Sequence, residues 1–200
     1  MSLSKQAKVL TKQQSDLLYA SLSLTQDEDR NRLIFLLSIK AGLRAKEIAD
    51  LRWSMVMEAN GCVSENISLD DAASKGNSGR QIPLNKQLRA ELVSQLKKVS
   101  SKRSLADLHG DRIVTTQRGD STSAQAIVNM FHGWYRKAGL MGCSSHSGRR
   151  TFITNAARKI STVGGSLRDV QWLAGHSSLQ TTQRYIDGDS DARRKVVDLV

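Results

Sequence analysis

The chain has 200 residues, and its 30 Lys and Arg against 19 Asp and Glu give a formal net charge of +11. Hydrophobic residues make up 39% of the sequence and recur along its length, so a compact domain with a buried core is expected. The longest apolar cluster, residues 33–37, is far shorter than the ~20 residues that cross a bilayer. The N-terminus has no apolar signal-peptide region, and two cysteines cannot form a disulfide framework. These features exclude membrane and disulfide-rich secreted classes and predict a cytoplasmic protein.

The excess of positive charge is typical of proteins that bind a polyanion, with nucleic acid ahead of an acidic membrane surface. The alternative is a basic domain that is simply well solvated. Charge by itself does not decide between the two.

Helical patterns and their end signals dominate the first 51 residues. Thr11 begins a helical stretch that runs to Leu22. Thr25, which is followed by an acidic run, is expected to cap the next helix, and that helix stops at Gly42. A short helix is predicted over residues 45–51.

The periodicity changes after residue 52. Asn60-Gly61 is a strong hairpin signal, and a second turn covers residues 76–79. Three short strands are therefore expected, at residues 53–56, 62–69 and 80–83. Pro83 ends the last strand where no ladder donor is needed, and Asn85 caps a helix that runs to about Val99.

The second half is predicted to be helical after a polar surface loop at residues 100–111. The expected helices cover residues 123–138, 146–159, 166–174, 178–186 and 191–199. The predicted fold class is mainly α with a small antiparallel β-sheet (α+β), in which the helices pack around the sheet.

Several basic residues lie at predicted helix edges beside glycine or serine, where a side chain is exposed and can meet an anion. Arg44 precedes a short helix, His146 and Arg149 open another, and His176 follows a helix end. A helix N-terminus offers unpaired N–H groups and partial positive charge, so His146 and Arg149 indicate a phosphate site. Taken singly, each residue is better explained as a solvated or structural side chain, and Tyr185 as a packed phenol.

The order and spacing of these residues resemble the tyrosine recombinase (phage integrase) family. The matching segments are residues 41–51 (AGLRAKEIADL), Lys75 beside a turn, residues 146–149 (HSGR) and residues 173–185 (LAGHSSLQTTQRY). The last segment is the most specific, because the family places a nucleophilic Tyr nine residues after the His of Leu-x-Gly-His. The resemblance covers about residues 11–186 and implies the integrase catalytic-core fold.

The resemblance also implies an activity: site-specific DNA recombination through a 3′-phosphotyrosine intermediate, without cofactor, metal or ATP. The family's catalytic positions correspond here to Arg44, Lys75, His146, Arg149, His176 and the nucleophile Tyr185. Among these, Lys75 would be the general acid and His146 would help to remove the proton of the phenol.

Two further positions have supporting roles in the resemblance. Glu47 matches the acidic residue after the first arginine and is expected to orient Arg44 by a charge-assisted hydrogen bond. The family usually has His-x-Leu-Arg-His, whereas Gly148 replaces the Leu and Arg150 replaces the second His in this chain. We expect these departures to affect efficiency more than mechanism.

Positive charges outside the motifs are candidates for contacts with the DNA backbone. They are Lys12, Arg80, Lys97, Lys98, Lys102 and Arg103. For the run at residues 97–103, a solvated helix end is an equally good explanation. Metal binding is not expected, because Cys143 and His146 lack further ligands at suitable spacing.

The expected partners are double-stranded DNA and further copies of the chain, as a tetramer that holds two DNA sites in the nucleoid. Residues 1–10 are expected to form an N-terminal stub, 11–187 the catalytic domain and 188–200 a tail helix. The family's usual N-terminal core-binding domain is expected to be absent, as in small fimbrial-type invertases, or removed, as in a fragment of a longer integrase.

Two other functions stay open from the sequence. One is a DNA-binding accessory protein that keeps the fold without recombination. The other is a nicking and closing enzyme that resembles a type IB topoisomerase. The sequence does not indicate whether the reaction is integration, excision or inversion.

Overall fold

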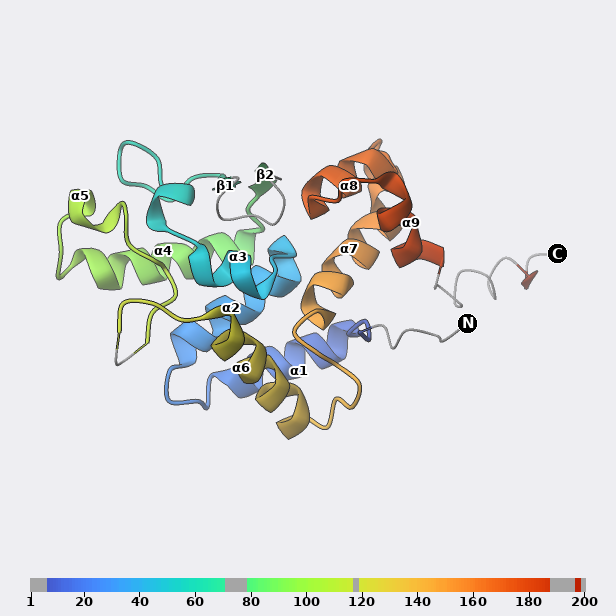
Figure 1. The fold of residues 1–200 in the computed structure, drawn as a ribbon, viewed down its shortest axis with the longest axis horizontal. Coiled ribbons are helices and arrows are strands. Elements are labelled where there is room, and N and C mark those ends of the chain that lie inside the picture. The colour runs from blue at the N-terminus through green and yellow to red at the C-terminus, as the bar shows by residue number, and fades with distance from the viewer. Residues whose placement is uncertain (1–6, 71–78, 117–118, 188–196, 199–200) are drawn as a thin grey trace.

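The computed structural model describes residues 7–70, 79–116, 119–187 and 197–198, and Figure 1 shows their arrangement. The α-helices are α1 (Lys12–Leu22), α2 (Glu28–Ala41), α3 (Ala45–Asp50), α4 (Lys86–Ser100), α5 (Leu105–Leu108), α6 (Ala124–Lys137), α7 (Ser147–Lys159), α8 (Leu167–Ala174) and α9 (Leu179–Asp187). The 3₁₀-helices are η1 (Trp53–Met55) and η2 (Ile160–Val163), and the strands are β1 (Asn66–Leu69) and β2 (Arg80–Pro83). The predicted fold class is confirmed.

The first two helices begin with different caps. The Thr11 side chain accepts a hydrogen bond from the Gln14 backbone N–H, and the Gln14 side chain accepts one from the Thr11 N–H, which completes a capping box for α1. The prediction that Thr25 caps α2 is wrong, because the cap position is Asp27. The Thr25 hydroxyl instead donates to the Leu22 carbonyl and accepts from the Asn31 side chain. Gly42, with φ 66°, ends α2 as expected.

The sheet is smaller than the sequence predicts. β1 and β2 pair antiparallel, with Ile67 opposite Ile82 and Leu69 opposite Arg80. Residues 53–55 form the 3₁₀-helix η1 instead of a strand, because the N–H groups of Trp53 and Ser54 donate to backbone carbonyls at 111 and 109. The turn around residues 60–61 is present, but it joins only one isolated bridge, between Met57 and Val63.

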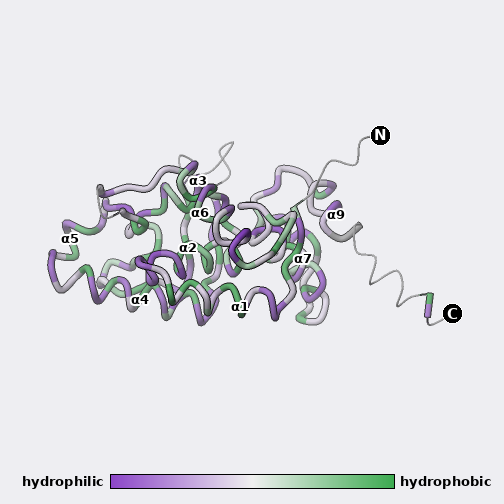
Figure 2. Tube along the Cα trace, turned by 90° about the horizontal axis from the view of Figure 1, so that it is seen from below, coloured by the Kyte–Doolittle hydropathy of each residue, from purple (hydrophilic) through white to green (hydrophobic). Residues whose placement is uncertain are grey.

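Helix α2 forms the centre of the main core. Nine of its fourteen residues are buried, around the whole circumference of the helix, as expected for a helix enclosed by others. It packs against α1, α4 and α7, and Figure 2 shows the hydrophobic stretch of α2 inside the molecule. A second, smaller hydrophobic cluster contains buried Ile153, Val170 and Ala174 and joins α7, α8 and α9.

The contact between α2 and α7 is unusually close at one point. A Cβ atom placed on Gly148 would lie 2.3 Å from the Ser38 hydroxyl oxygen, so a larger residue requires α7 to move away from α2. Ser38 is fully buried. The departure of Gly148 from the family pattern therefore has a structural counterpart, a close approach of two backbones next to Arg149.

The polar loop predicted at residues 100–111 contains the one-turn helix α5. The predicted tail helix and Lys75 lie outside the described residues, apart from positions 197–198. No helix in the described part of the chain is long and apolar enough to span a bilayer.

Candidate functional site

Five of the six predicted catalytic residues converge from four separate parts of the chain. Arg44 is the N-cap of α3, His146 is the N-cap of α7, and Arg149 lies in the first turn of α7. His176 follows the end of α8, and Tyr185 lies on α9. The sixth, Lys75, falls in residues 71–78, outside the described residues.

Glu47 connects two of the arginines. Its side chain is 1% exposed, and each carboxylate oxygen accepts two hydrogen bonds. Arg44 donates to it from the backbone N–H (2.8 Å) and from Nη1 (2.7 Å), so Glu47 orients Arg44. Arg80 donates from Nη1 and Nη2, at 3.1 Å each. Burial raises the pKa of Glu47, but the bonds and charges of Arg80 and Arg44 outweigh burial and leave it below the usual value.

Arg149 is held by two backbone carbonyls at helix ends. It is 4% exposed, and its Nη1 donates to the Gly42 carbonyl at 2.6 Å, while Nη2 donates to the Ala174 carbonyl. These carbonyls lie where α2 and α8 end, and Gly42 and Gly175 both adopt positive φ there. The two left-handed glycines therefore end the helices so that carbonyls without an intrahelical partner face Arg149.

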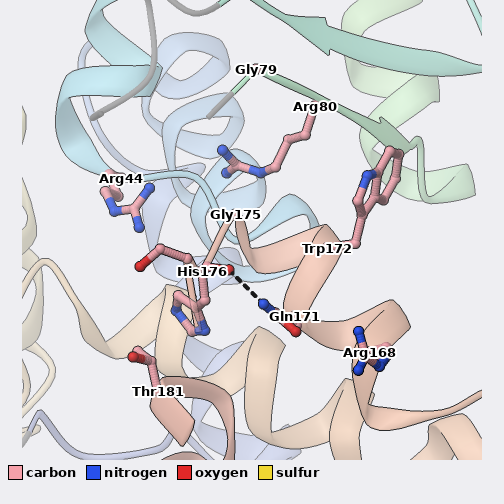
Figure 3. Close-up of a pocket in the computed structure, with 10 residues that line it drawn as sticks. Arg44, Gly79, Arg80, Arg168, Gln171, Trp172, Gly175, His176 and Thr181 are labelled. Carbon is pink, nitrogen blue, oxygen red and sulfur yellow. Dashed lines mark hydrogen bonds between the residues drawn. The ribbon is translucent and has the colours of Figure 1, made fainter. Parts of the chain in front are cut away.

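The Tyr185 ring is close to an imidazole and to a guanidinium. It stacks on His176 with centroids 5.4 Å apart and an interplanar angle of 25°, and the Arg150 guanidinium carbon lies 5.6 Å from its centroid. His176 Nδ1 is hydrogen-bonded to the hydroxyl of fully buried Thr182 at 2.9 Å. Gln171 donates to the His176 carbonyl at 3.0 Å, as Figure 3 shows. The imidazole that faces Tyr185 is thus fixed at its ring and at its backbone.

Two hollows meet at this pair of rings, and Thr181 lines both. The hollow on the Tyr185 side, about 360 Å³, is also lined by His146 and Arg149. The other, about 730 Å³, is lined by Arg44, Arg80, Arg168, Trp172 and His176. Figure 3 shows the guanidinium groups of Arg44 and Arg80 turned toward each other above His176. The arrangement suits an extended anionic substrate that passes over the cationic groups.

Burial and nearby positive charge both lower the pKa values of the two histidines in the site. Burial, followed by the charges of Arg149, Arg44 and Arg80, lowers the pKa of His176 to about 4. Partial desolvation of its ring, followed by the charges of Arg149 and Arg44, also lowers the pKa of His146. Both imidazoles are therefore neutral at pH 7, and the fixed positive charge comes from arginine. Burial and the charge of Arg44 lower the pKa of Arg149 to about 10, so it stays protonated at that pH.

We expect His176 in the DNA-free protein to titrate near pH 4, which an NMR pH titration of its imidazole signals would measure. An unfolded chain has a histidine pKa near 6.5, so it binds more protons than the folded chain between these values. The free energy of unfolding should therefore fall as pH drops from about 6.5 to 4. His176→Gln should weaken this dependence in urea denaturation. A His176 pKa at or above 6.5 would contradict the prediction.

The residues predicted to contact DNA are dispersed. Lys12 lies 3.9 Å from Asp16, Lys98 pairs with Asp29, and Arg103 pairs with Asp111. Lys97 and Lys102 are exposed. The segment that leads from α4 into α5 lies at the opposite end of the molecule from α8 and α9 (Figure 1). The structure does not bring the run at residues 97–103 to the arginine site.

Arg80 differs from its predicted role. Its side chain is 2% exposed and is bonded to Glu47 and to the Leu173 carbonyl, so it does not offer the free surface of a DNA-backbone contact. Sequence reasoning also missed Thr182 as the partner of His176. The Thr-Thr-x-x-Tyr pattern contains that threonine, but only the turn between α8 and α9 places its hydroxyl at the imidazole.

The possible metal ligands in the described part of the chain do not form a cluster. Among the residues that the structure describes, no group of three or more His, Cys, Asp or Glu side chains is placed to hold a metal ion. Cys143 is partly buried and Cys62 is exposed, and both are free thiols.

Comparison with known proteins shows which family has this helical fold with a buried arginine site. A family model described as "Phage integrase family" matches residues 8–191. The chain therefore belongs to the phage integrase family, as its motifs predicted.

Curated proteins similar to this chain include tyrosine recombinases. Tyrosine recombinase XerA of Pyrococcus furiosus is 26% identical over 162 residues, which cover 81% of this chain and 51% of that protein. XerA of Thermococcus kodakarensis is 29% identical over 178 residues, which cover 89% and 57%. The chain spans about half the length of the curated relatives that it matches.

Solved structures share the fold. The crystal structure of XerA recombinase has a TM-score of 0.73 at 22% identity and covers 96% of this chain and 64% of that chain. The Tn1549 transposon integrase, in complex with circular intermediate DNA, has a TM-score of 0.67 at 20% identity and covers 98% and 67%. These similarities confirm the predicted integrase catalytic-core fold.

Proposed function

We propose that this chain cuts and rejoins DNA at specific sites by transesterification, with Tyr185 as the nucleophile. The observation that carries the proposal is a phenol stacked on a neutral, fixed imidazole beside Arg149, which lines the same hollow. A protein that only binds DNA needs positive charge, but it has no need of a positioned phenol beside an arginine clamp. The recombinases that share the fold include one solved with circular intermediate DNA, which supports DNA as the substrate.

The chemistry is a balanced exchange of phosphate ester bonds. The Tyr185 oxygen attacks the phosphorus, the bond from phosphorus to the 5′-oxygen breaks, and a 3′-phosphotyrosine and a 5′-hydroxyl result. The phenol loses a proton and the leaving oxygen gains one. A 5′-hydroxyl of another strand then reverses the step, so the ester bond is conserved and no ATP is consumed.

The arginines supply the electrostatic part of this reaction. Negative charge increases on the non-bridging oxygens in the transition state, and guanidinium groups that are already fixed in place stabilise it without reorganisation. Arg44 and Arg149 meet this requirement, because Glu47 orients one and two carbonyls orient the other. His176 would add a neutral N–H donor.

Proton transfer requires a base and an acid. The pKa of a phenol is near 10, so Tyr185 needs a base at neutral pH. His146 lines the same hollow as Tyr185, and its lowered pKa keeps it neutral and able to accept the proton. Lys75, by its resemblance to the hairpin lysine of the family, would protonate the leaving 5′-oxygen. Arg150 would support Tyr185 by its position over the ring.

The proposal includes the partners. Double-stranded DNA is the substrate, and strand exchange between two sites requires more than one copy of the chain, with a tetramer as the expected assembly. No organic cofactor takes part in the proposed steps. Action on chromosomal DNA would place the protein in the cytoplasm with the nucleoid.

Trapping of the covalent intermediate tests the proposal. We expect the protein, incubated with nicked duplexes from which the cleaved end diffuses away, to form an adduct that survives a denaturing gel. Mass spectrometry should map the nucleotide to Tyr185, and adduct formation should weaken with added salt because phosphate contacts release counterions. A library drawn from the DNA flanking the gene would supply the target site. Binding to a site without any adduct would contradict the proposal, and relaxation of plasmids without site preference would favour a topoisomerase.

A further inference from the structure

Arg80 is, with Arg149, one of two almost fully buried arginines near the site, and it contacts three elements. It begins β2, opposite Leu69 of β1. Its Nη atoms reach Glu47 on α3, and its Nε donates to the Leu173 carbonyl at the end of α8, at 3.0 Å. Both charged side chains of the pair are at most 2% exposed. A buried charge pair with all its polar atoms bonded is costly to assemble, so its location next to Arg44 calls for a role.

The role follows from the charges. Glu47 orients Arg44, but one carboxylate against one guanidinium forms a neutral pair that has little attraction for a phosphate. With Arg80 on the opposite side of the same carboxylate, two positive groups share one negative group and a net charge of +1 remains. Arg44 is the more exposed partner, at 24% against 2% for Arg80, so it carries this charge toward the hollow.

We propose that Arg80 is a positioning residue that neutralises Glu47, so that Glu47 can orient Arg44 without cancelling the attraction of Arg44 for the scissile phosphate. This inference rests on the proposed DNA cleavage. Arg80 acts through Glu47 and does not touch the DNA.

The same side chain also fixes the end of α8. Leu173 and Ala174 present consecutive carbonyls, one bonded to Arg80 and the next to Arg149. A Cβ atom on Gly175 would lie 2.8 Å from Arg80 Nη1, so the glycine lets the guanidinium approach. The turn that carries His176 is therefore attached to both arginines.

A double-mutant cycle tests the proposal. The variants are Arg80→Met, Glu47→Gln and the two combined, and the measurements are the single-turnover cleavage rate and the dissociation constant on a duplex that forms an adduct with the unmodified protein. Arg80→Met should slow cleavage about 10- to 100-fold, by analogy with the loss of a group that orients a metal-binding side chain. The dissociation constant should change less. In the Glu47→Gln background, Arg80→Met should have a much smaller effect, because no carboxylate is left to neutralise.

Two results would overturn the proposal: an Arg80→Met protein that cleaves at the unmodified rate, or an equal loss in both backgrounds, which would indicate packing alone. If Arg80→Met does not fold, the combined variant still tests the proposal, because it lacks both buried charges of the Arg80–Glu47 pair. Its cleavage rate is then compared with that of Glu47→Gln. Arg32→Met removes an ion pair with Glu91 between α2 and α4 and serves as the control, which should lower stability without slowing cleavage. Absence of an adduct with the unmodified protein would contradict the cleavage function itself, a separate outcome.

Discussion

Tyr185→Phe should abolish the covalent protein–DNA adduct while DNA binding is retained. Phenylalanine has no oxygen to attack the phosphorus, yet it keeps the ring that stacks on His176 and lies under Arg150. The fold should therefore persist, and the loss should be confined to chemistry. The measurements are adduct formation on a denaturing gel and the dissociation constant from fluorescence anisotropy on the same duplex.

Tyr19→Phe is the matched control for this variant. The Tyr19 hydroxyl contacts Arg32 and Glu91 among α1, α2 and α4, outside the site, so its removal should leave the adduct in place. An adduct that persists in Tyr185→Phe would show that another residue is the nucleophile. Loss of DNA binding together with the adduct would place Tyr185 in the binding surface instead.

Arg149→Lys should slow cleavage by about 100- to 1000-fold, the cost typical of removing one preorganised donor from a developing oxyanion. Lysine keeps a positive charge, but a compact ammonium group cannot reproduce the planar fork that reaches the Gly42 and Ala174 carbonyls together. A buried acceptor left without a partner also destabilises the fold, by about 1–3 kcal/mol. Single-turnover kinetics and urea denaturation of the same preparation measure both effects.

Arg52→Lys provides the comparison for Arg149→Lys. Arg52 also donates to a backbone carbonyl, that of Gly110, but it is exposed and far from Tyr185 in the chain and outside both hollows. The Arg52→Lys variant should therefore cleave DNA at the rate of the unmodified protein. A cleavage rate of Arg149→Lys within a few-fold of the unmodified protein would contradict the prediction. It would show that a positive charge at this position is enough and that the planar guanidinium geometry is not needed.

The sequence predicted most of this fold because most of its signals are local. Capping residues and left-handed glycines, such as Thr11 and Gly42, mark helix ends from within a few residues, and the motif spacings predicted residues that the structure brings together. The failures involve contacts between distant segments. Residues 53–55 form a 3₁₀-helix because the carbonyls of 111 and 109 accept the N–H groups of Trp53 and Ser54, and no local sequence pattern predicts that pairing.

The same distinction explains what was missed in the site. Glu47 was expected to orient Arg44, since the two lie one helical turn apart. Arg80 reads in the sequence as one more surface charge beside a turn, because its partners lie on α3 and α8, far away in the chain. Whether a charged residue is buried is decided by tertiary packing, which the composition of its own segment does not encode.

The small hydrophobic cluster beneath Tyr185 has a mechanical consequence. Arg44 projects from the edge of the large core around α2, whereas Tyr185 packs against a cluster with only three fully buried side chains in the part of the chain that the structure describes. Local opening costs least where few apolar contacts must be broken. The proposed nucleophile therefore lies where fewer apolar contacts must be broken, so a movement of α9 would shift the phenol relative to Arg44, which the larger core holds.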